Sequence, residues 1–319
     1  MLSVILVSAM FAAGCLFACV NVTFAQTYPA KPIRIVTASA GGGTDFVSRL
    51  IANGLSPTIG QQMIVDNRST ALIGVSVAQA APDGYTLLIN GTSFWLAPLL
   101  MDKPTYDVPK DFAPISLLTT SPTLILVHAS LPARSVKDLI TLAKTHPGKL
   151  NYGSSTSGAP THLAGELFKA MAGVDIVRIP YSGNGPALNA LVSGEVPLMF
   201  SNAGSATQHI ESGRLRALAV ASARPTALAP GLPTVTSVVP GYVAASTYGL
   251  FAPMGTPATV ISKLNQEIVR YINTPNARDK LFQTGVEVVG STPEQLAATV
   301  SNDLRIWGKV IRDKGIRGE

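Results

Sequence analysis

The chain has 319 residues, of which 47% are hydrophobic, and a formal net charge of +6. Its lysines and arginines are scattered singly, without the clustered stripe typical of nucleic-acid-binding proteins, so we expect no nucleic-acid partner. Both cysteines, Cys15 and Cys19, stand within the first 25 residues. If that segment is removed, no cysteine remains for disulfides, thiol catalysis or thiolate metal sites.

Residues 1–25 contain no charged side chain and predict an export signal. An apolar stretch of about 20 residues is near the length that spans a bilayer. The segment closes on 23-TFA-25, however, and small residues at this spacing are typical of signal-peptide cleavage. We therefore expect cleavage near Ala25 and an exported chain long enough for about two domains. Lipidation of Cys19 is the weaker alternative, because bulky Phe17 stands where a small residue is usual.

After Pro29, short β-branched runs alternate with segments of helical spacing. The runs predicted to be strands are residues 33–37, 62–66, 85–89, 124–128, 149–153, 176–180, 196–200 and 215–220. Helical spacing is clear in residues 46–55 and 163–171. This alternation predicts an α/β fold whose parallel sheets carry helices on both faces.

Two later helices have marked starts. Thr256-Pro257 and Thr292-Pro293 each pair an expected N-cap residue with a proline at the first helical position. In the second helix Trp307 lies on the apolar stripe, so we predict that it is a core residue and not a ligand-stacking one.

Signatures of catalysis are missing from the sequence. The stretch 153-GSSTS-157 lacks the final glycine of a nucleophile elbow, and no H-E-x-x-H occurs. His162 and Glu166 stand four apart on an expected helix, but no third ligand is in sight, so we interpret them as a surface or capping pair. We expect no catalytic residue, no metal and no cofactor.

The glycine loop 41-GGGTD-45 resembles a phosphate-binding loop, but it matches neither the P-loop motif nor the dinucleotide-binding fingerprint. It has no lysine after its last glycine and no glycine at position 46. It is instead one of five small polar loops that follow predicted strands: residues 39–45, 91–93, 154–161, 181–185 and 201–202. Ligands bind at the carboxyl ends of strands in open parallel sheets, so these loops predict a binding site.

Several motifs in order resemble one family. They are 41-GGGTD-45, 80-AAPDGYTLL-88, 149-KLNYGSS-155, 161-THLAGELF-168, 180-PYSG-183, 215-LRALAV-220 and 248-YGLFAPMGTP-257. On these motifs the chain is similar to the periplasmic solute-binding receptors of tripartite tricarboxylate transporters, the Bug-type proteins. The resemblance runs from Tyr28 to the C-terminus.

The resemblance implies a two-domain periplasmic-binding-protein fold, of the Venus flytrap, type II-like kind, with two strand crossovers. The first crossing is expected near 124–128 and the return near 246–251. Domain one then comprises residues 27–125 and 247–319, and domain two comprises residues 126–246. The implied activity is capture of a small organic carboxylate or amino acid, without chemistry, by a periplasmic monomer that delivers it to membrane permease subunits. A receptor for a membrane sensor kinase is the alternative, and an exported hydrolase is a third reading.

The expected ligand-binding residues come from both domains. They are Gly42, Gly43, Thr44, Asp45, Ser93, Ser154, Ser155, Thr161, Tyr181 and Ser201. Glycines let the backbone approach a ligand closely, and N–H groups at the start of the next helix meet an anion. The Asp45 carboxylate would repel that anion, so we favour a capping role for it over direct contact.

For the other candidates, alternatives stay open. Ser154, Ser155 and Thr161 resemble the family's ligand-facing hydroxyls, but ordinary turn and cap chemistry would also explain them. Tyr181 could face the ligand or pack at the hinge.

Departures from the family pattern bear on the ligand. Ser39-Ala40 replaces prolines, Ala159-Pro160 replaces hydroxyls, 69-STALIG-74 replaces a glycine-rich loop, and Ser201 stands where an acid is frequent. Because these changes remove polarity, we expect a less charged carboxylate, aromatic or monocarboxylic, over a citrate-like one.

Overall fold

The computed structural model describes residues 28–38, 40–41 and 43–318, without the side chains of Thr70 and Ala71. The expected export signal, its cleavage site at Ala25 and Cys19 lie outside these residues, as does the candidate Gly42. Within the described part of the chain, no helix has the length and apolar character needed to cross a membrane.

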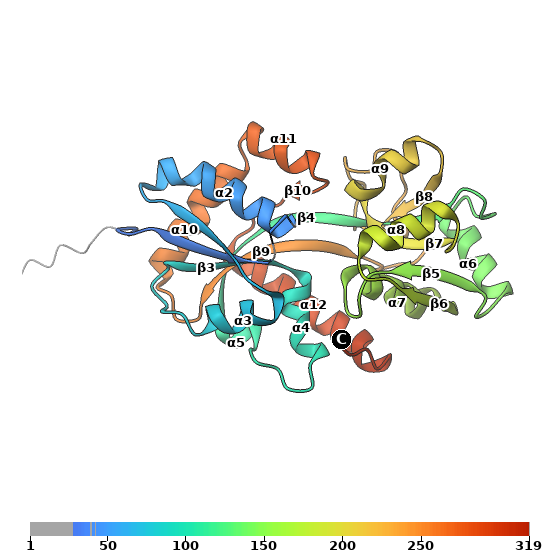
Figure 1. The fold of residues 1–319 in the computed structure, drawn as a ribbon, viewed down its shortest axis with the longest axis horizontal. Helices are drawn as coiled ribbons and strands as arrows, with labels where there is room; N and C mark the ends of the chain where they lie inside the picture. The colour runs from blue at the N-terminus through green and yellow to red at the C-terminus, as the bar shows by residue number, and fades with distance from the viewer. Residues whose placement is uncertain (1–27, 39, 42, 319) are drawn as a thin grey trace, which may run out of the picture.

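Strands and helices alternate along the chain (Figure 1). The strands are β1 (Ile33–Thr37), β2 (Met63–Asn67), β3 (Thr86–Gly91), β4 (Phe112–His128), β5 (Leu150–Ser154), β6 (Ile176–Pro180), β7 (Leu198–Asn202), β8 (Leu215–Val220), β9 (Ala245–Pro253) and β10 (Glu287–Val288). The helices are α2 (Gly43–Ile59), α3 (Thr70–Ala78), α4 (Thr92–Leu100), α5 (Val108–Asp111), α6 (Val136–Thr145), α7 (Pro160–Ala172), α8 (Asn184–Ser193), α9 (Ala203–Glu211), α10 (Ala258–Ile272), α11 (Pro275–Gln283) and α12 (Pro293–Asp313), with a 3-10 turn at Val235–Ser237. All the predicted strands are present, but the fourth begins at Phe112, well before the expected start.

The strands form two lobes joined by β4 and β9. In lobe one, β1 pairs in parallel with β2 and β3, and β9 lies antiparallel to β3. In lobe two, β5 pairs in parallel with β6 and β7. β4 belongs to both: it pairs with β9 as far as Pro122, and from Thr123 it pairs with β7 and β8. Figure 1 shows β4 and β9 running side by side from one lobe toward the other.

The two-lobed α/β architecture agrees with the fold class predicted from the sequence. The domain limits at 125/126 and 246/247 stay a prediction, since the pairing of β4 changes between Pro122 and Thr123 without dividing the chain there. Prolines are tolerated in this central strand for a local reason. The β4–β9 register shifts just after Pro114, and Pro122, which has no N–H to donate, stands where the strand changes partners.

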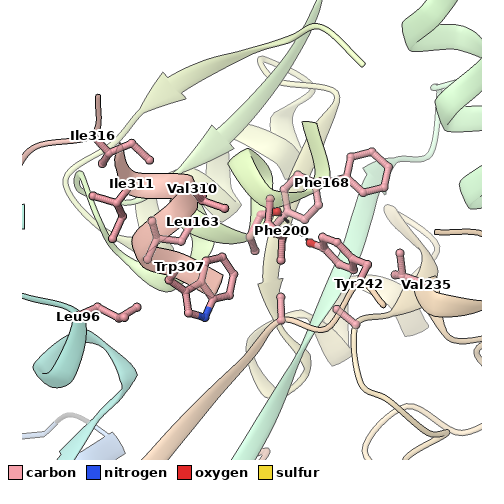
Figure 2. Packing of buried hydrophobic residues seen from close by; sticks show 14 of the residues in the cluster. Leu96, Leu163, Phe168, Phe200, Val235, Tyr242, Trp307, Val310, Ile311 and Ile316 are labelled. Carbon is pink, nitrogen blue, oxygen red and sulfur yellow. Dashed lines mark hydrogen bonds between the residues drawn. The ribbon is translucent and has the colours of Figure 1, made fainter. Parts of the chain in front are cut away.

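One buried apolar cluster spans both lobes. The C-terminal helix α12 packs against α4 of lobe one and α7 of lobe two. Figure 2 shows Trp307 of α12 beside Leu163 of α7 in this cluster, which also includes Phe200 of β7. Trp307 is 6% exposed, which confirms that it is a core residue.

Of the two helix starts predicted from Thr-Pro pairs, the structure confirms one and contradicts the other. Thr292 caps α12 as expected, and with Gln295 it forms a reciprocal capping box. The prediction for Thr256 is wrong, because α10 begins one residue later and Pro257 occupies the N-cap position. The Thr256 hydroxyl donates instead to the Pro253 carbonyl, at 2.8 Å, in the turn that follows β9.

Candidate ligand-binding site

The first candidate loop joins β1 to α2. Gly41 adopts a φ of +83°, in the left-handed region that favours glycine. Gly43 begins α2, and a Cβ added there would collide with the hydroxyl and ring of Tyr248. This loop therefore brings the N-terminus of α2, with its free N–H groups, against a tyrosine from the crossing strand β9.

Asp45 is held inside this loop. Its carboxylate accepts from the Gly41 N–H at 2.9 Å, from Asn67 Nδ2 at 2.9 Å and from Arg49 Nε at 3.1 Å. Burial alone would raise the pKa of the carboxyl, but the hydrogen bonds from Arg49, Gly41 and Asn67 and the charge of Arg49 hold it below its ordinary value. An ionised Asp45 thus ties the glycine loop to α2 and β2, which supports the capping role.

Thr44 lies beside it in the first turn of α2 and is 9% exposed. Its carbonyl accepts from the Ser48 hydroxyl at 2.7 Å. Its own hydroxyl has no hydrogen bond to any residue that the structure describes.

The second loop starts α4 and is bonded to β9. The hydroxyls of Thr92 and Thr247 lie 3.0 Å apart, and the Thr247 N–H donates to Thr92 Oγ1 at 3.1 Å. A Cβ on Gly91, the N-cap of α4, would lie 3.1 Å from the Thr247 carbonyl and from the Tyr248 ring. Tyr248 therefore lies against the starts of both α2 and α4, and burial raises the pKa of its hydroxyl.

In lobe two, the hydroxyls of the loop between β5 and α7 are largely used within the protein. Ser155 Oγ and Thr161 Oγ1 lie 2.8 Å apart, and the Ser155 N–H donates to Thr161 Oγ1 at 3.1 Å. Ser154 is fully buried, and its hydroxyl accepts from Arg178 Nε at 2.7 Å. The structure thus brings these three candidates together, and it adds Arg178, which the sequence does not predict.

The other two candidates of lobe two, Tyr181 and Ser201, bond to residues outside this loop. The Tyr181 hydroxyl donates to Glu195 at 2.9 Å. Because Glu195 precedes β7, the ring runs back along the sheet and not out past the carboxyl ends of the strands. Ser201 is fully buried, and its hydroxyl donates to Asn184 Oδ1 at 3.2 Å and lies 3.0 Å from Ser205 Oγ. This polar group joins the starts of α8 and α9.

The first and second lobes meet at a cavity of about 780 Å³. Its walls include Ser93 and Leu100 of α4 and residues 156–160, which lead into α7. Asp102, Lys103 and Arg317 are the charged residues of the lining. Ser93 is exposed and faces this cavity, so the N-terminal ends of α4 and α7 border the same space.

His162 and Glu166 do not form the surface pair that the sequence suggests. Both are buried, because α7 packs this face against the sheet. His162 Nδ1 accepts from the Gly158 N–H at 3.0 Å, and Glu166 accepts from the Tyr152 hydroxyl at 2.8 Å and from Lys169 at 3.1 Å. Across the described residues, no group of three or more His, Cys, Asp or Glu side chains could hold a metal ion.

The chain matches a known receptor family. The family model described as "Tripartite tricarboxylate transporter family receptor" matches residues 47–316. The chain belongs to this family. It is a TctC-type solute-binding receptor, which confirms both the family and the fold class that the sequence predicts.

Three proteins illustrate the similarity of the receptor to its relatives. BugT of Bordetella pertussis is 34% identical over 300 residues, which cover 92% of each chain. The structure of Rpa4515 of R. palustris with adipate is 35% identical, with a TM-score of 0.75 and coverage of 91% of the receptor and 99% of that chain. MatC (Rpa3494) from Rhodopseudomonas palustris, solved with bound malate, is 31% identical, with a TM-score of 0.72 and coverage of 89% and 100%.

Proposed function

We propose that the receptor captures a small organic carboxylate between its lobes and delivers it, unchanged, to the membrane permease subunits of a tripartite tricarboxylate transporter. The observation that carries this proposal is the cavity between the lobes, bordered by the N-terminal ends of α4 and α7. Two helix N-termini therefore border one space, and a helix N-terminus favours negative charge. The start of α2 lies against Tyr248, as the start of α4 does, but it does not line this cavity.

The ligand class follows from the balance of charges and from the relatives. Adipate and malate, the ligands of the two related structures, are both carboxylates. Around the site, Asp45 is already occupied by Arg49, Asn67 and the loop N–H of Gly41, so it does not oppose an anion with a free charge. We keep the expectation of a less charged, aromatic or monocarboxylic ligand as part of the proposal.

A ligand panel tests the proposal directly. Adipate, malate, benzoate and glutamate are each added to purified, ligand-free receptor and the thermal midpoint is measured. A ligand at 100 times its Kd stabilises the folded state by about 2.7 kcal/mol, which raises the midpoint of a chain of this size by roughly 5–10 °C. If no member of the panel, nor any other small organic acid at millimolar concentration, shifts the midpoint, carboxylate capture is wrong. Recovery of the ligand unchanged after incubation, checked by NMR, is expected for a receptor without enzymatic activity.

Delivery to a permease is tested in cells. Deleting the receptor gene is expected to abolish uptake of the radiolabelled ligand, and a plasmid copy is expected to restore it. Unchanged uptake together with loss of a ligand-dependent transcriptional response would favour the sensor-kinase alternative. In the same cells we expect the mature chain to be periplasmic and to begin at Gln26. The purified chain is expected to behave as a monomer in light scattering.

A further inference from the structure

Arg178 joins β6 to the candidate ligand loop of lobe two. Its guanidinium donates to Ser154 Oγ at 2.7 Å, to the Ser155 carbonyl at 2.8 Å and to Ser157 Oγ at 3.4 Å. β6 is the outermost strand of its sheet, and the side chain extends from this edge to the carboxyl end of the adjacent strand β5. One half-buried cation therefore contacts three successive or nearly successive residues of the loop.

The charge of this cation is not balanced by an ion pair. Its three partners are two hydroxyls and a carbonyl, and no carboxylate oxygen of a described residue lies within 4.0 Å of its nitrogens. Buried Glu166, on the neighbouring helix, is paired with Lys169 at 3.1 Å. An unpaired charge that is partly shielded from water acts over a longer range than a solvated one.

In the lobe-two loop before α7, several backbone N–H groups already donate hydrogen bonds within the protein and are not free to bind an anion. The N–H groups of Ser155, Gly158 and Ala159 donate to Thr161 Oγ1, His162 Nδ1 and the Thr156 carbonyl, respectively. The helix α7 then begins at Pro160, which has no N–H. Fewer free N–H groups therefore remain here than a helix start ordinarily offers to an anion.

We propose that Arg178 is a positioning residue for ligand binding: it fixes residues 154–157 and supplies the positive potential that holds the ligand carboxylate on the lobe-two side. This inference rests on the proposed capture of a carboxylate. It adds the residue that provides the charge, which neither the helix start nor the loop hydroxyls supply.

The chain offers a matched control in Arg216 of β8. This arginine is also half-buried in lobe two, and its guanidinium donates to the carbonyls of Ala129, Leu131 and Ala133, at 3.0–3.4 Å. Replacing Arg216 removes the same net charge and a comparable set of hydrogen bonds, but away from the ligand loop.

The experiment compares Arg178→Met, Arg178→Gln, Arg178→Lys and Arg216→Met with the wild type. Adipate, malate and benzoate are titrated in turn by calorimetry, at low and at high salt. Arg178→Met is expected to weaken binding of the carboxylate that the wild type takes by about tenfold, or ~1.4 kcal/mol, and to reduce the salt dependence of its affinity. Arg178→Lys keeps the charge, so it should bind more tightly than Arg178→Met and should keep the salt dependence of the wild type. Arg178→Gln has no charge and should reach neither the affinity nor the salt dependence of the wild type. Arg216→Met should bind as the wild type does.

Hydrogen exchange provides a readout that needs no ligand. In Arg178→Met, amides of residues 155–158 are expected to exchange faster while those of β4 and β5 keep their protection. Unchanged affinity and salt dependence in a folded Arg178→Met overturn the inference and leave carboxylate capture intact. A wild type that binds no carboxylate overturns the proposed function, and the inference with it. If Arg178→Met fails to fold, the Lys and Gln variants decide, since equal affinities and equal salt dependence in those two also contradict a role for the charge.

Discussion

Replacing Asp45 tests whether its ionised carboxylate stabilises the glycine loop between β1 and α2. Replacing it with asparagine keeps one oxygen that can accept a hydrogen bond but removes the charge that Arg49 and the loop N–H of Gly41 engage. Asp45 is 5% exposed and accepts hydrogen bonds from three groups, at 2.9–3.1 Å. Hydrogen bonds to a charged acceptor contribute about 1.5–3 kcal/mol each, but the Arg49 side chain is 51% exposed and its share is screened by water.

We therefore expect Asp45→Asn to lower the free energy of unfolding by about 1–3 kcal/mol at pH 7, measured by urea denaturation. The pKa of this carboxyl is lower in the folded chain than its ordinary value of 3.8, so the stabilisation that its charge provides is present above about pH 5. As the pH falls through 3.8 toward the folded pKa, that stabilisation is lost. The difference between wild type and Asp45→Asn should thus be constant near neutrality and shrink below about pH 4.

Asp279→Asn is the control for this series. Asp279 is exposed on α11 and makes no hydrogen bond or ion pair with any described residue, so its replacement should change stability little at either pH. An Asp45→Asn variant as stable as the wild type at pH 7, or a difference that persists unchanged at pH 3, would refute the account of Asp45 as an ionised cap.

Three further outcomes follow from the contacts described. Trp307→Ala should lower the free energy of unfolding by about 3–5 kcal/mol in urea, because the ring is buried between the lobes, and a loss below about 1 kcal/mol would contradict that packing. Gly43→Ala should cost about 1–3 kcal/mol, because its Cβ meets Tyr248, and adding Tyr248→Ala should remove this penalty; a penalty equally large in a Tyr248→Ala background would count against the contact. Burial raises the pKa of Asp303 to about 6 although Trp95 Nε1 donates to it at 2.9 Å, so its ionisation destabilises the fold as the pH rises from 3.8 through 6. The gain in free energy of unfolding from Asp303→Asn, measured by urea denaturation, should therefore be larger at pH 7 than at pH 4. A larger gain at pH 4 would contradict a raised pKa for Asp303.

The strands were predictable from sequence because their signal is local. Runs of β-branched residues and the helical spacing between them need no knowledge of distant parts of the chain. The early part of β4 escaped this reasoning, since Pro114 and Pro122 argue against a central strand. The structure accommodates both through a register shift and a change of partner, which depend on β9 more than one hundred residues later.

The loops of the candidate site were predictable in position but not in detail. All of them lie at or just after the carboxyl end of a strand, and that placement comes from the alternation of elements alone. The direction of a side chain depends on partners remote in sequence: Tyr181 turns to Glu195, and Ser154 accepts from Arg178. Arg178 itself lies in an apolar strand pattern, 176-IVRIP-180, and no spacing rule would have connected it to the loop.

The contacts between the lobes limit how the receptor can move. A hinge motion has to bend β4, because it pairs with strands of both lobes, together with β9, which runs beside it. On one side the lobes touch at two glycines, where a Cβ on Gly204 of α9 would lie 3.0 Å from the Cα of Gly285. On another side, α12 fastens α4 to α7 through the shared apolar cluster. Since both contacts lie beside the crossing strands, a rotation that keeps them intact would have to pivot near them.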